Sequence, residues 1–408
     1  MRKNKPIHFI FLGIASRGHI APTLPLVKTL IGLGYKVTYF NTAAFKYLIE
    51  ETGARFIDYS SECLNNISIP ISLMEPHEIT IELQKYFFVS TTEILPVITS
   101  YHASEAFDVV IYDQMALWGQ IFADKYNLLS FCSNTMFLFN TEDIINQLPK
   151  FIPNLNSEYH SKLNLIKNAS SNVVSYSDVL DIQTAAKSNY IITYYSKELL
   201  ASPPNFDQKK IIYLGNRFDS AYSPSMVEFS SESLIYISLG TVFNEKIDLF
   251  TLFIDTFNGT NHQVIITTGN NETVCRALKN ISVNSNIHIF KFVNQVEILS
   301  KASLFITHAG FNSIYEGLYF TVPMLMIPHI PEQYFNAIRV KELNAGYLLN
   351  ADKIQKEGLA KALGEVQKEW FTYKSSAIKI RQSFLKSYNN LTAALKMLVF
   401  QEKYERKL

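Results

Sequence analysis

The stretch that most constrains the fold is residues 292–333, FVNQVEILSKASLFITHAGFNSIYEGLYFTVPMLMIPHIPEQ. Its apolar run at residues 302–307 predicts a buried strand. The strand stops at His308-Ala309-Gly310, and helix-forming sequence follows at once. Such a turn is a common anion site of α/β sheets, because the first N–H groups of the helix lack partners and the helix dipole is positive there. The stretch therefore predicts an α/β sheet that binds an anion at this turn.

Polar side chains around the turn suit a phosphorylated sugar. Those that add hydrogen-bond donors beside the helix start are His308, Asn312 and Ser313. A second short strand, residues 322–327, leads to Glu332 and Gln333, and a carboxylate beside an amide suits neighbouring sugar hydroxyls. A His-x-Gly turn alone is common in parallel sheets, so the prediction depends on the whole ordered set.

The ordered set resembles the nucleotide-sugar signature of the UDP-glycosyltransferase superfamily (glycosyltransferase family 1), most strongly its bacterial macrolide and flavonoid members. That signature runs from an aromatic residue and a Gln to His-x-Gly-x-Asn-Ser, a Glu three residues on, and Asp/Glu-Gln after a Pro-rich strand. The matching residues are Phe292, Gln295, His308, Gly310, Asn312, Ser313, Glu316, Glu332 and Gln333. The sequence departs from the pattern at Phe292, where Trp is common, at Ala309, where Gly or Cys is frequent, and at Glu332, where Asp is common.

The resemblance implies a role for each matching residue. Phe292 would stack on the base, and the main chain of Val293 would pair with the base edge. The residues implied at hydroxyl groups are Gln295 and Glu316 for the ribose and Glu332 and Gln333 for the sugar. Those implied around the phosphates are Ser238, Gly240, Thr241, His308, Gly310, Asn312 and Ser313.

The length and the net charge of the chain limit the possible classes of protein. A chain of 408 residues is long for one core, so we expect two domains. A formal net charge of +1 and an isoelectric point of about 7.7 do not indicate a basic surface for binding nucleic acid. No apolar run approaches a membrane span, and residues 1–13 fit a first strand better than a signal peptide.

The cysteines indicate a reducing compartment. Cys63, Cys132 and Cys275 lie far apart and lack the spacing of metal ligands, so we interpret them as buried thiols outside any disulfide. We therefore expect a cytoplasmic protein, and we expect it to be a monomer or a weak dimer.

The first half of the chain alternates strands with helices. The expected strands are residues 7–12, 35–40, 55–57, 107–113, 128–132 and 190–194. Residues 20–31 and 78–104 have helical character, whereas residues 135–180 are irregular and are expected to cover the acceptor site. The alternation predicts a parallel sheet with right-handed crossovers.

Two polar residues follow strands of this sheet. His19 comes just after the first strand, and Asp113 ends a later one, so both lie on the carboxyl edge, where ligands collect. An imidazole held by a carboxylate can take a proton from a hydroxyl near neutral pH. Either residue alone has structural explanations. The run Gly18-His19-x-x-Pro22-x-x-Pro25-Leu26 resembles the family's first loop, however, and the family pairs this His with an Asp, which implies His19 as general base with Asp113 as its partner.

The second half repeats the pattern of the first. Residues 215–232 are polar and contain Gly, Pro and Ser, so they read as a linker. After them, LIYISLG echoes IHFIFLG, HQVIITTG echoes YKVTYFN, and ASLFITHAG takes the place of FDVVIYD. This predicts an α/β protein of two Rossmann-like doubly wound domains, and the resemblance implies the GT-B architecture, in which they face across a cleft. The expected parts are an acceptor domain at 1–214, a linker at 215–232, a donor domain at 233–381 and a returning helix at 382–408.

The resemblance implies an inverting UDP-dependent hexosyltransferase. Its donor would be a UDP-sugar, with glucose as the default, and its acceptor an apolar hydroxylated molecule such as a flavonoid, macrolide or other polyketide. The sequence contains no Asp-x-Asp pair for a metal. Fixed donors and a helix N-terminus can stabilise the leaving diphosphate instead, so we predict no metal site and no cofactor beyond the donor itself.

Three alternatives stay open. A nucleotide-sugar epimerase on the same architecture would turn over the donor without an acceptor. A non-catalytic nucleotide-sugar-binding partner of another transferase would need no base, although His19 and Asp113 are both present. A membrane-associated transferase would need a basic amphipathic helix, and we find none strong enough in the sequence.

Overall fold

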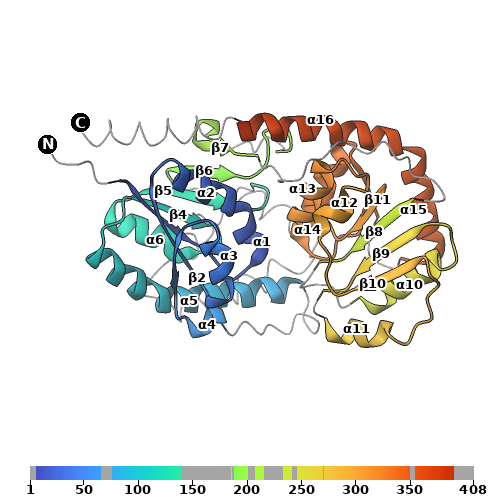
Figure 1. Ribbon diagram of the computed structural model, residues 1–408, viewed down its shortest axis with the longest axis horizontal. Helices are drawn as coiled ribbons and strands as arrows, with labels where there is room; N and C mark the ends of the chain where they lie inside the picture. The colour runs from blue at the N-terminus through green and yellow to red at the C-terminus, as the bar shows by residue number, and fades with distance from the viewer. Residues whose placement is uncertain are drawn as a thin grey trace. The chain divides into compact units, whose positions relative to one another are not determined.

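The computed structural model describes residues 6–65, 76–138, 185, 188–200, 207–215, 233–240, 246–269, 271–349 and 354–389. The chain divides into two compact units (Figure 1). Unit 1 comprises Met1–Ser196, Ser202–Asn216 and Lys386–Leu408, and unit 2 comprises Lys197–Ala201 and Arg217–Leu385. The predicted linker at 215–232 lies outside the described residues except for Gly215.

Unit 1 is built on a seven-stranded parallel sheet with the order β3-β2-β1-β4-β5-β6-β7. Its strands are β1 (His8–Leu12), β2 (Lys36–Asn41), β3 (Arg55–Asp58), β4 (Val109–Asp113), β5 (Leu129–Asn134), β6 (Tyr190–Thr193) and β7 (Ile211–Tyr213). All five residues of β1 and all five of β4 are buried. Strands that are buried on both faces have nearly continuous apolar sequences, as these two strands do. The six strands predicted for this half are confirmed, and β7 is added at the edge.

Helices cover both faces of this sheet. They are α1 (Arg17–Ile20), α2 (Leu24–Gly32), α3 (Lys46–Glu50), α4 (Glu62–Asn65), α5 (Pro76–Ser104) and α6 (Leu117–Tyr126), with 3-10 turns at Ala21–Thr23, Ala43–Phe45 and Gln208–Lys210. Val27 and Leu30 of α2 pack with Phe9 and Phe11 on one face. On the other face, Trp118 of α6 donates to the Tyr59 hydroxyl at 2.9 Å and stacks edge-on against its ring.

Unit 2 repeats this topology. Its six-stranded parallel sheet has the order β10-β9-β8-β11-β12-β13. The strands are β8 (Leu234–Ser238), β9 (Gln263–Thr267), β10 (Ile287–Phe290), β11 (Leu304–Thr307), β12 (Met324–Met326) and β13 (Gly346–Leu348). Strands β8, β9 and β11 hold the sheet positions of β1, β2 and β4, so the repeat predicted from the sequence is a repeat of topology.

The helices of unit 2 lie in two layers, as Figure 1 shows, with α12, α13 and α14 on one side of the sheet and α10, α11 and α15 on the other. They are α10 (Ile247–Phe257), α11 (Glu272–Leu278), α12 (Gln295–Leu299), α13 (Phe311–Tyr319), α14 (Pro331–Glu342), α15 (Lys356–Lys368) and α16 (Trp370–Asn389). Phe250 and Phe253 of α10 pack against Ile235 and Ile237 of β8 in one core. Arg339 of α14 donates to the carbonyl groups of residues 198–200, which explains why this short segment belongs to unit 2.

The predictions for the C-terminal helix and for the burial of the cysteines are only partly confirmed. The helix expected over residues 382–408 is described only as far as Asn389, where Tyr388 packs against the core of unit 1. Cys132 is buried and outside any disulfide as expected, whereas Cys275 is also outside any disulfide but only half-buried. The Cys275 thiol lies 3.1 Å from the hydroxyl of Thr268, just after β9. The side chain of Cys63 lies outside the described residues.

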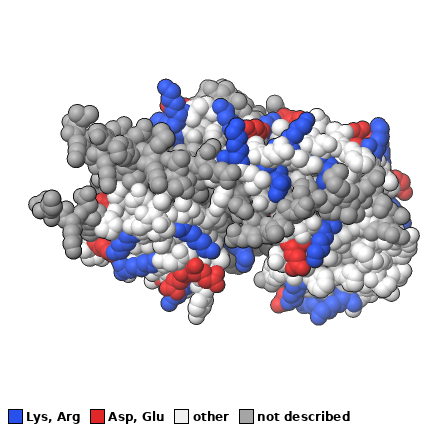
Figure 2. Space-filling model, turned by 45° about the horizontal axis from the view of Figure 1, so that its top comes forward, with Lys and Arg blue, Asp and Glu red and all other residues white. Residues whose placement is uncertain are grey.

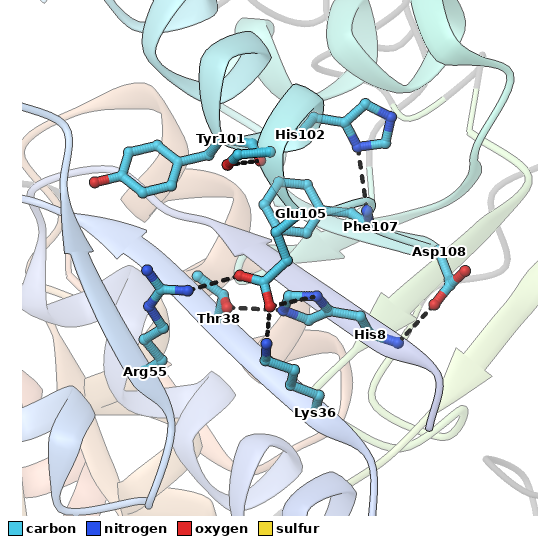
Figure 3. A network of polar contacts seen from close by, with 10 residues as sticks. His8, Lys36, Thr38, Arg55, Tyr101, His102, Glu105, Phe107 and Asp108 are labelled. Atoms are coloured by element: carbon cyan, nitrogen blue, oxygen red, sulfur yellow. Dashed lines mark hydrogen bonds and ion pairs between the residues drawn. The ribbon is translucent and has the colours of Figure 1, made fainter. Parts of the chain in front are cut away.

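A polar network ties together the amino ends of the unit 1 strands (Figure 3). The carboxylate of Glu105, just after α5, forms ion pairs with Lys36 of β2 and with Arg55 of β3, the latter at 2.7 Å. Asp108 accepts from the main-chain N–H of His8 at 2.8 Å. These contacts organise the edge of the sheet opposite to the carboxyl ends of the strands.

The described surface is mixed in charge. On the side shown in Figure 2, Lys and Arg side chains are interspersed with Asp and Glu. Among the described residues, none of the helices is both long and apolar enough to cross a membrane.

Candidate active site

Each sheet has one topological switch point, where the strand order reverses direction along the sheet. The predicted site residues His19, Asp113, Ser238 and His308 lie at these two switch points. In unit 1 the point falls between β1 and β4, and in unit 2 it falls between β8 and β11. The loops after such adjacent strands run to opposite faces, so their carboxyl ends leave a crevice that binds ligands in α/β sheets. This topology gives a physical reason for the positions of His19, Asp113, Ser238 and His308.

In unit 1 the structure brings His19 and Asp113 together. His19 lies in the short helix α1, directly after β1, and Asp113 is the last residue of β4. The His19 Nδ1 and Asp113 Oδ2 atoms are 2.8 Å apart. The Asp113 side chain is 4% exposed and that of His19 is 20% exposed. The carboxylate is therefore held inside the protein, while the imidazole reaches the surface.

The surroundings of the pair fix its geometry and its tautomer. The other Asp113 oxygen, Oδ1, accepts from the main-chain N–H of Met115 at 2.9 Å. An ionised carboxylate only accepts hydrogen bonds, so the His19 proton is assigned to Nδ1, and Nε2 is then the basic atom of the neutral ring.

Thr135 is a third member of this group, and it was not predicted from the sequence. Its Oγ1 lies 3.0 Å from the His19 Nδ1 atom. Thr135 follows β5, which is the neighbour of β4 in the sheet, and it is buried. In the sequence, Thr135 is recognisable only as a polar residue close after a predicted strand. The order of the strands in the sheet was needed to place it beside His19.

In unit 2, His308 lies between two glycines. A Cβ atom built on Gly240 would come within 2.7 Å of the His308 Nε2 atom, and one built on Gly310 would come closer still. Gly240 also has a φ of +85°, which L side chains rarely adopt. Ala309, between His308 and Gly310, has a φ of +64°. The imidazole therefore fits only because both neighbouring turns lack side chains at these positions.

Burial keeps the imidazoles in this region uncharged at neutral pH. Burial lowers the pKa of His308 to about 4, against a smaller opposing effect of the Ser238 main chain. Burial, followed by Lys246 and His308, lowers the pKa of His329 to about 3. A neutral imidazole can donate a hydrogen bond without placing a buried positive charge in the protein.

Helix α13 begins at the same turn with Gly310 at its N-cap position, and glycine has no side chain that could cap the helix. Asn312 is half-buried and Ser313 is 8% exposed in that turn. The positive end of the helix dipole and these side chains form an arrangement that suits an anion. Ser238, at the end of β8, is buried at the neighbouring strand end, whereas Thr241 lies outside the described residues.

The residues predicted for the nucleoside form a connected group. Gln295, the first residue of α12, donates to the Glu316 carboxylate of α13 at 2.7 Å. The Tyr236 hydroxyl donates to Gln295 Oε1 at 3.0 Å, and sequence reasoning missed Tyr236 because it looks like an ordinary strand residue. Phe292 is 53% exposed after edge strand β10, which leaves its ring accessible for stacking, and Val293 beside it is half-buried.

The Glu-Gln pair has two different environments. Glu332 is half-buried in the first turn of α14, and its Oε1 accepts from Asn336 Nδ2 at 2.6 Å. Gln333 is 2% exposed, and its Oε1 accepts from the main-chain N–H of His329 at 2.9 Å. Gln333 therefore orients the loop before α14. Asn336 was not identified from the sequence.

Comparison with known proteins defines the class. Residues 221–386 match the family described as UDP-glucoronosyl and UDP-glucosyl transferase. The NDP-glycosyltransferase YjiC of Bacillus licheniformis is 30% identical over 88% of this chain and 89% of its own length. The uncharacterized UDP-glucosyltransferase YdhE of Bacillus subtilis is 28% identical over 92% of this chain and 93% of its own.

A solved structure shares the fold. The glycotransferase of kitacinnamycin superimposes with a TM-score of 0.78 at 19% identity, covering 97% of this chain and 99% of that one. Two parallel-sheet α/β units with this similarity define a GT-B glycosyltransferase fold, as the sequence predicted. The chain belongs to the UDP-glycosyltransferase family and is a transferase.

Proposed function

We propose that this protein is an inverting glycosyltransferase that moves a sugar from UDP to a hydroxyl of an apolar small molecule. The observation that supports this most is the His19–Asp113 pair, with Nδ1 and Oδ2 2.8 Å apart at the carboxyl edge of unit 1. A general base must lie within hydrogen-bond reach of the proton it takes, and His19 reaches the surface while its partner stays buried.

The chemical step follows from these two residues. His19 Nε2 takes the proton of the acceptor hydroxyl while that oxygen forms a bond to the anomeric carbon. The bond from that carbon to the diphosphate oxygen breaks, and the nucleoside diphosphate leaves with the electron pair. Attack opposite to the leaving group inverts the anomeric configuration. Asp113 holds the Nδ1 proton and stabilises the imidazolium that forms.

Unit 2 supplies the donor site in this proposal. The exposed Phe292 ring stacks on the base, with the main chain of Val293 at the base edge. Gln295 and Glu316, already joined at 2.7 Å, hold the ribose hydroxyls. The groups assigned to the phosphates are Ser238, Gly240, Thr241, His308, Gly310, Asn312 and Ser313. Glu332 faces the sugar hydroxyls, and the buried Gln333 acts through the loop it holds.

Transfer is expected to proceed without a metal ion. The leaving diphosphate would be stabilised by the positive end of the α13 dipole and by neutral His308, which are fixed in place before the reaction. The measurement is the initial rate of transfer in excess EDTA compared with the rate in added magnesium or manganese. Equal rates are expected. Loss of activity with chelator and its return with either metal would overturn this part of the proposal.

Glucose is the proposed sugar and a hydrophobic hydroxylated molecule the proposed acceptor. A distant relative, the oleandomycin glycosyltransferase of Streptomyces antibioticus, is 21% identical over 87% of this chain and 83% of its own length, and its name supports a macrolide-type acceptor. The high content of 29 Phe and 23 Tyr is compatible with an apolar acceptor site. The cysteine pattern supports a cytoplasmic location, and a monomer or weak dimer remains our expectation.

A transfer screen tests the proposed function. UDP-sugars and dTDP-sugars are incubated with a phenolic acceptor and with a macrolide acceptor, and product mass is measured. We expect an added hexose mass with UDP-glucose and at least one acceptor. Conversion of the donor without any acceptor would favour an epimerase. Binding of UDP-glucose without turnover of any acceptor would favour a non-catalytic partner of another transferase.

A further inference from the structure

Asn336 lies at a junction between the turn after β11 and helix α14. Its side chain is 0% exposed. The two hydrogens of its amide are both used, because Nδ2 donates to the Ala309 carbonyl at 3.0 Å and to Glu332 Oε1 at 2.6 Å. Its Oδ1 is buried and has no hydrogen-bond partner among the described residues. The amide is thus held entirely by these two donated bonds.

We propose that Asn336 is a positioning residue that aims the Glu332 carboxylate at the donor sugar and fixes it relative to the His308–Ala309–Gly310 turn. The proposal rests on the proposed function and deepens it, because it names what sets sugar recognition at that site. It distinguishes recognition of the sugar from recognition of the nucleotide, which depends on other residues.

The bond from Asn336 restricts the direction of the Glu332 carboxylate. Glu332 and Asn336 are four residues apart on α14, so their side chains lie on the same helix face. The 2.6 Å bond uses one carboxylate oxygen, Oε1, and thereby fixes where the other oxygen points. A glutamate side chain has several rotatable bonds, and holding one geometry in advance reduces the ordering cost when a sugar binds.

The bond to Ala309 connects that carboxylate to the phosphate side of the site. Ala309 has a φ of +64°, an uncommon conformation for a residue with a side chain, and its carbonyl accepts from Asn336. The same turn places His308 between Gly240 and Gly310. One buried amide therefore holds the sugar-facing carboxylate and the phosphate-facing turn in a fixed relation.

A merely structural asparagine is available as a matched control. Asn286 is 7% exposed, and its Nδ2 donates to the carbonyl groups of Phe257 and His262, each at 2.9 Å. Like Asn336, it donates two bonds from a buried amide, and its Oδ1 also accepts from the main-chain N–H of Gly259 at 3.3 Å. It precedes β10, however, and so lies at the amino edge of the sheet, away from the strand ends that carry the site.

The experiment measures the dissociation constants of UDP and of UDP-glucose by calorimetry for each full-length variant, together with its melting temperature. The ratio of the UDP constant to the UDP-glucose constant isolates the part of binding that the sugar provides. The variants are Asn336→Ala, Asn336→Asp, Asn286→Ala, Glu332→Ala and the double variant Asn336→Ala with Glu332→Ala. If the transfer screen selects another sugar nucleotide, that compound replaces UDP-glucose.

Asn336→Ala and Asn336→Asp are expected to lower this ratio by about 10-fold or more, the equivalent of one hydrogen bond to a charged group. A loss of UDP affinity that comes from the Ala309 turn lowers the binding of both ligands and cancels in the ratio. Asn286→Ala is expected to lower the melting temperature and leave the ratio at the wild-type value. The double variant is expected to match Glu332→Ala alone, because Asn336 acts through Glu332.

Several outcomes would overturn the proposal. An unchanged ratio in both Asn336 variants would do so, and so would a double variant whose losses simply add. Failure of both Asn336 variants to fold would make the residue a core element and reject the positioning role. A wild-type protein that binds neither UDP nor UDP-glucose would instead reject the proposed function, so the two failures are distinguishable.

Discussion

Replacing His19 by alanine is expected to slow sugar transfer by about 10²- to 10⁴-fold, the usual contribution of a general base. The affinity for the UDP-sugar should stay close to the wild-type value, because His19 belongs to unit 1 and the predicted donor residues belong to unit 2. The turnover number is measured with saturating donor and acceptor, and donor affinity is measured separately by calorimetry.

Two further variants sharpen this test. Asp113→Asn should also be slow, because an amide in place of the carboxylate no longer favours the His19 tautomer with its proton on Nδ1 or stabilises the imidazolium. His288→Ala is a matched control, since His288 is exposed on β10 and belongs to no predicted site. A turnover number that is unchanged in His19→Ala would remove His19 from the catalytic role.

Replacing Gly310 by alanine is expected to lower the catalytic efficiency with the UDP-sugar by about 10²-fold, the effect of displacing a catalytic group by roughly 1 Å. Gly310 has a φ of −59°, which alanine adopts without strain, so the backbone alone predicts no penalty. The added Cβ would, however, collide with the His308 Nε2 atom and force the imidazole out of its place. Steady-state kinetics with varied donor concentration measure the change.

The chain offers matched glycine controls for this prediction. Gly358 and Gly364 lie in α15, and a Cβ built on either meets nothing within 4 Å. Gly358→Ala and Gly364→Ala should leave kinetics unchanged and stabilise the fold by up to about 1 kcal/mol each, since alanine is the better helix former. If Gly310→Ala behaves like these controls, the position of His308 between the two glycines has no functional consequence.

The arrangement of the strands could be predicted from the sequence because buried parallel strands are continuous apolar runs. The runs at β1, β2 and β4 recur as β8, β9 and β11, and the sheet orders confirm that they are equivalent. Residues directly after these runs had to lie on one edge of each sheet, which is why His19 was predicted near Asp113. The grouping of His308 with Ser238 was implied by the family resemblance.

Element boundaries were less predictable. The strand expected from residue 107 begins at Val109, because the Phe107 N–H donates to His102 Nδ1 at 3.1 Å and its ring packs against Phe122. Strand β13 was missed because it is only three residues long and starts at Gly346, where strand propensity is low.

The supporting residues of the site could not be found from sequence motifs. Thr135, Tyr236 and Asn336 contact His19, Gln295 and Glu332 through neighbouring strands or through a helix turn. Each is an ordinary residue type for its position, and only the three-dimensional pairing distinguishes it. Gln333 is the opposite case. Its position in the motif could be read from the sequence, but its buried hydrogen bond to the His329 main chain could not.

The most direct test of the central claim is proton NMR of the glycoside formed from UDP-glucose, in which the sugar is α-linked to the diphosphate. Base-assisted attack from the side opposite to UDP predicts a β-linked product, read from the coupling of the anomeric proton. An α-linked glycoside, or the absence of any glycoside with acceptors of both classes, would contradict the account.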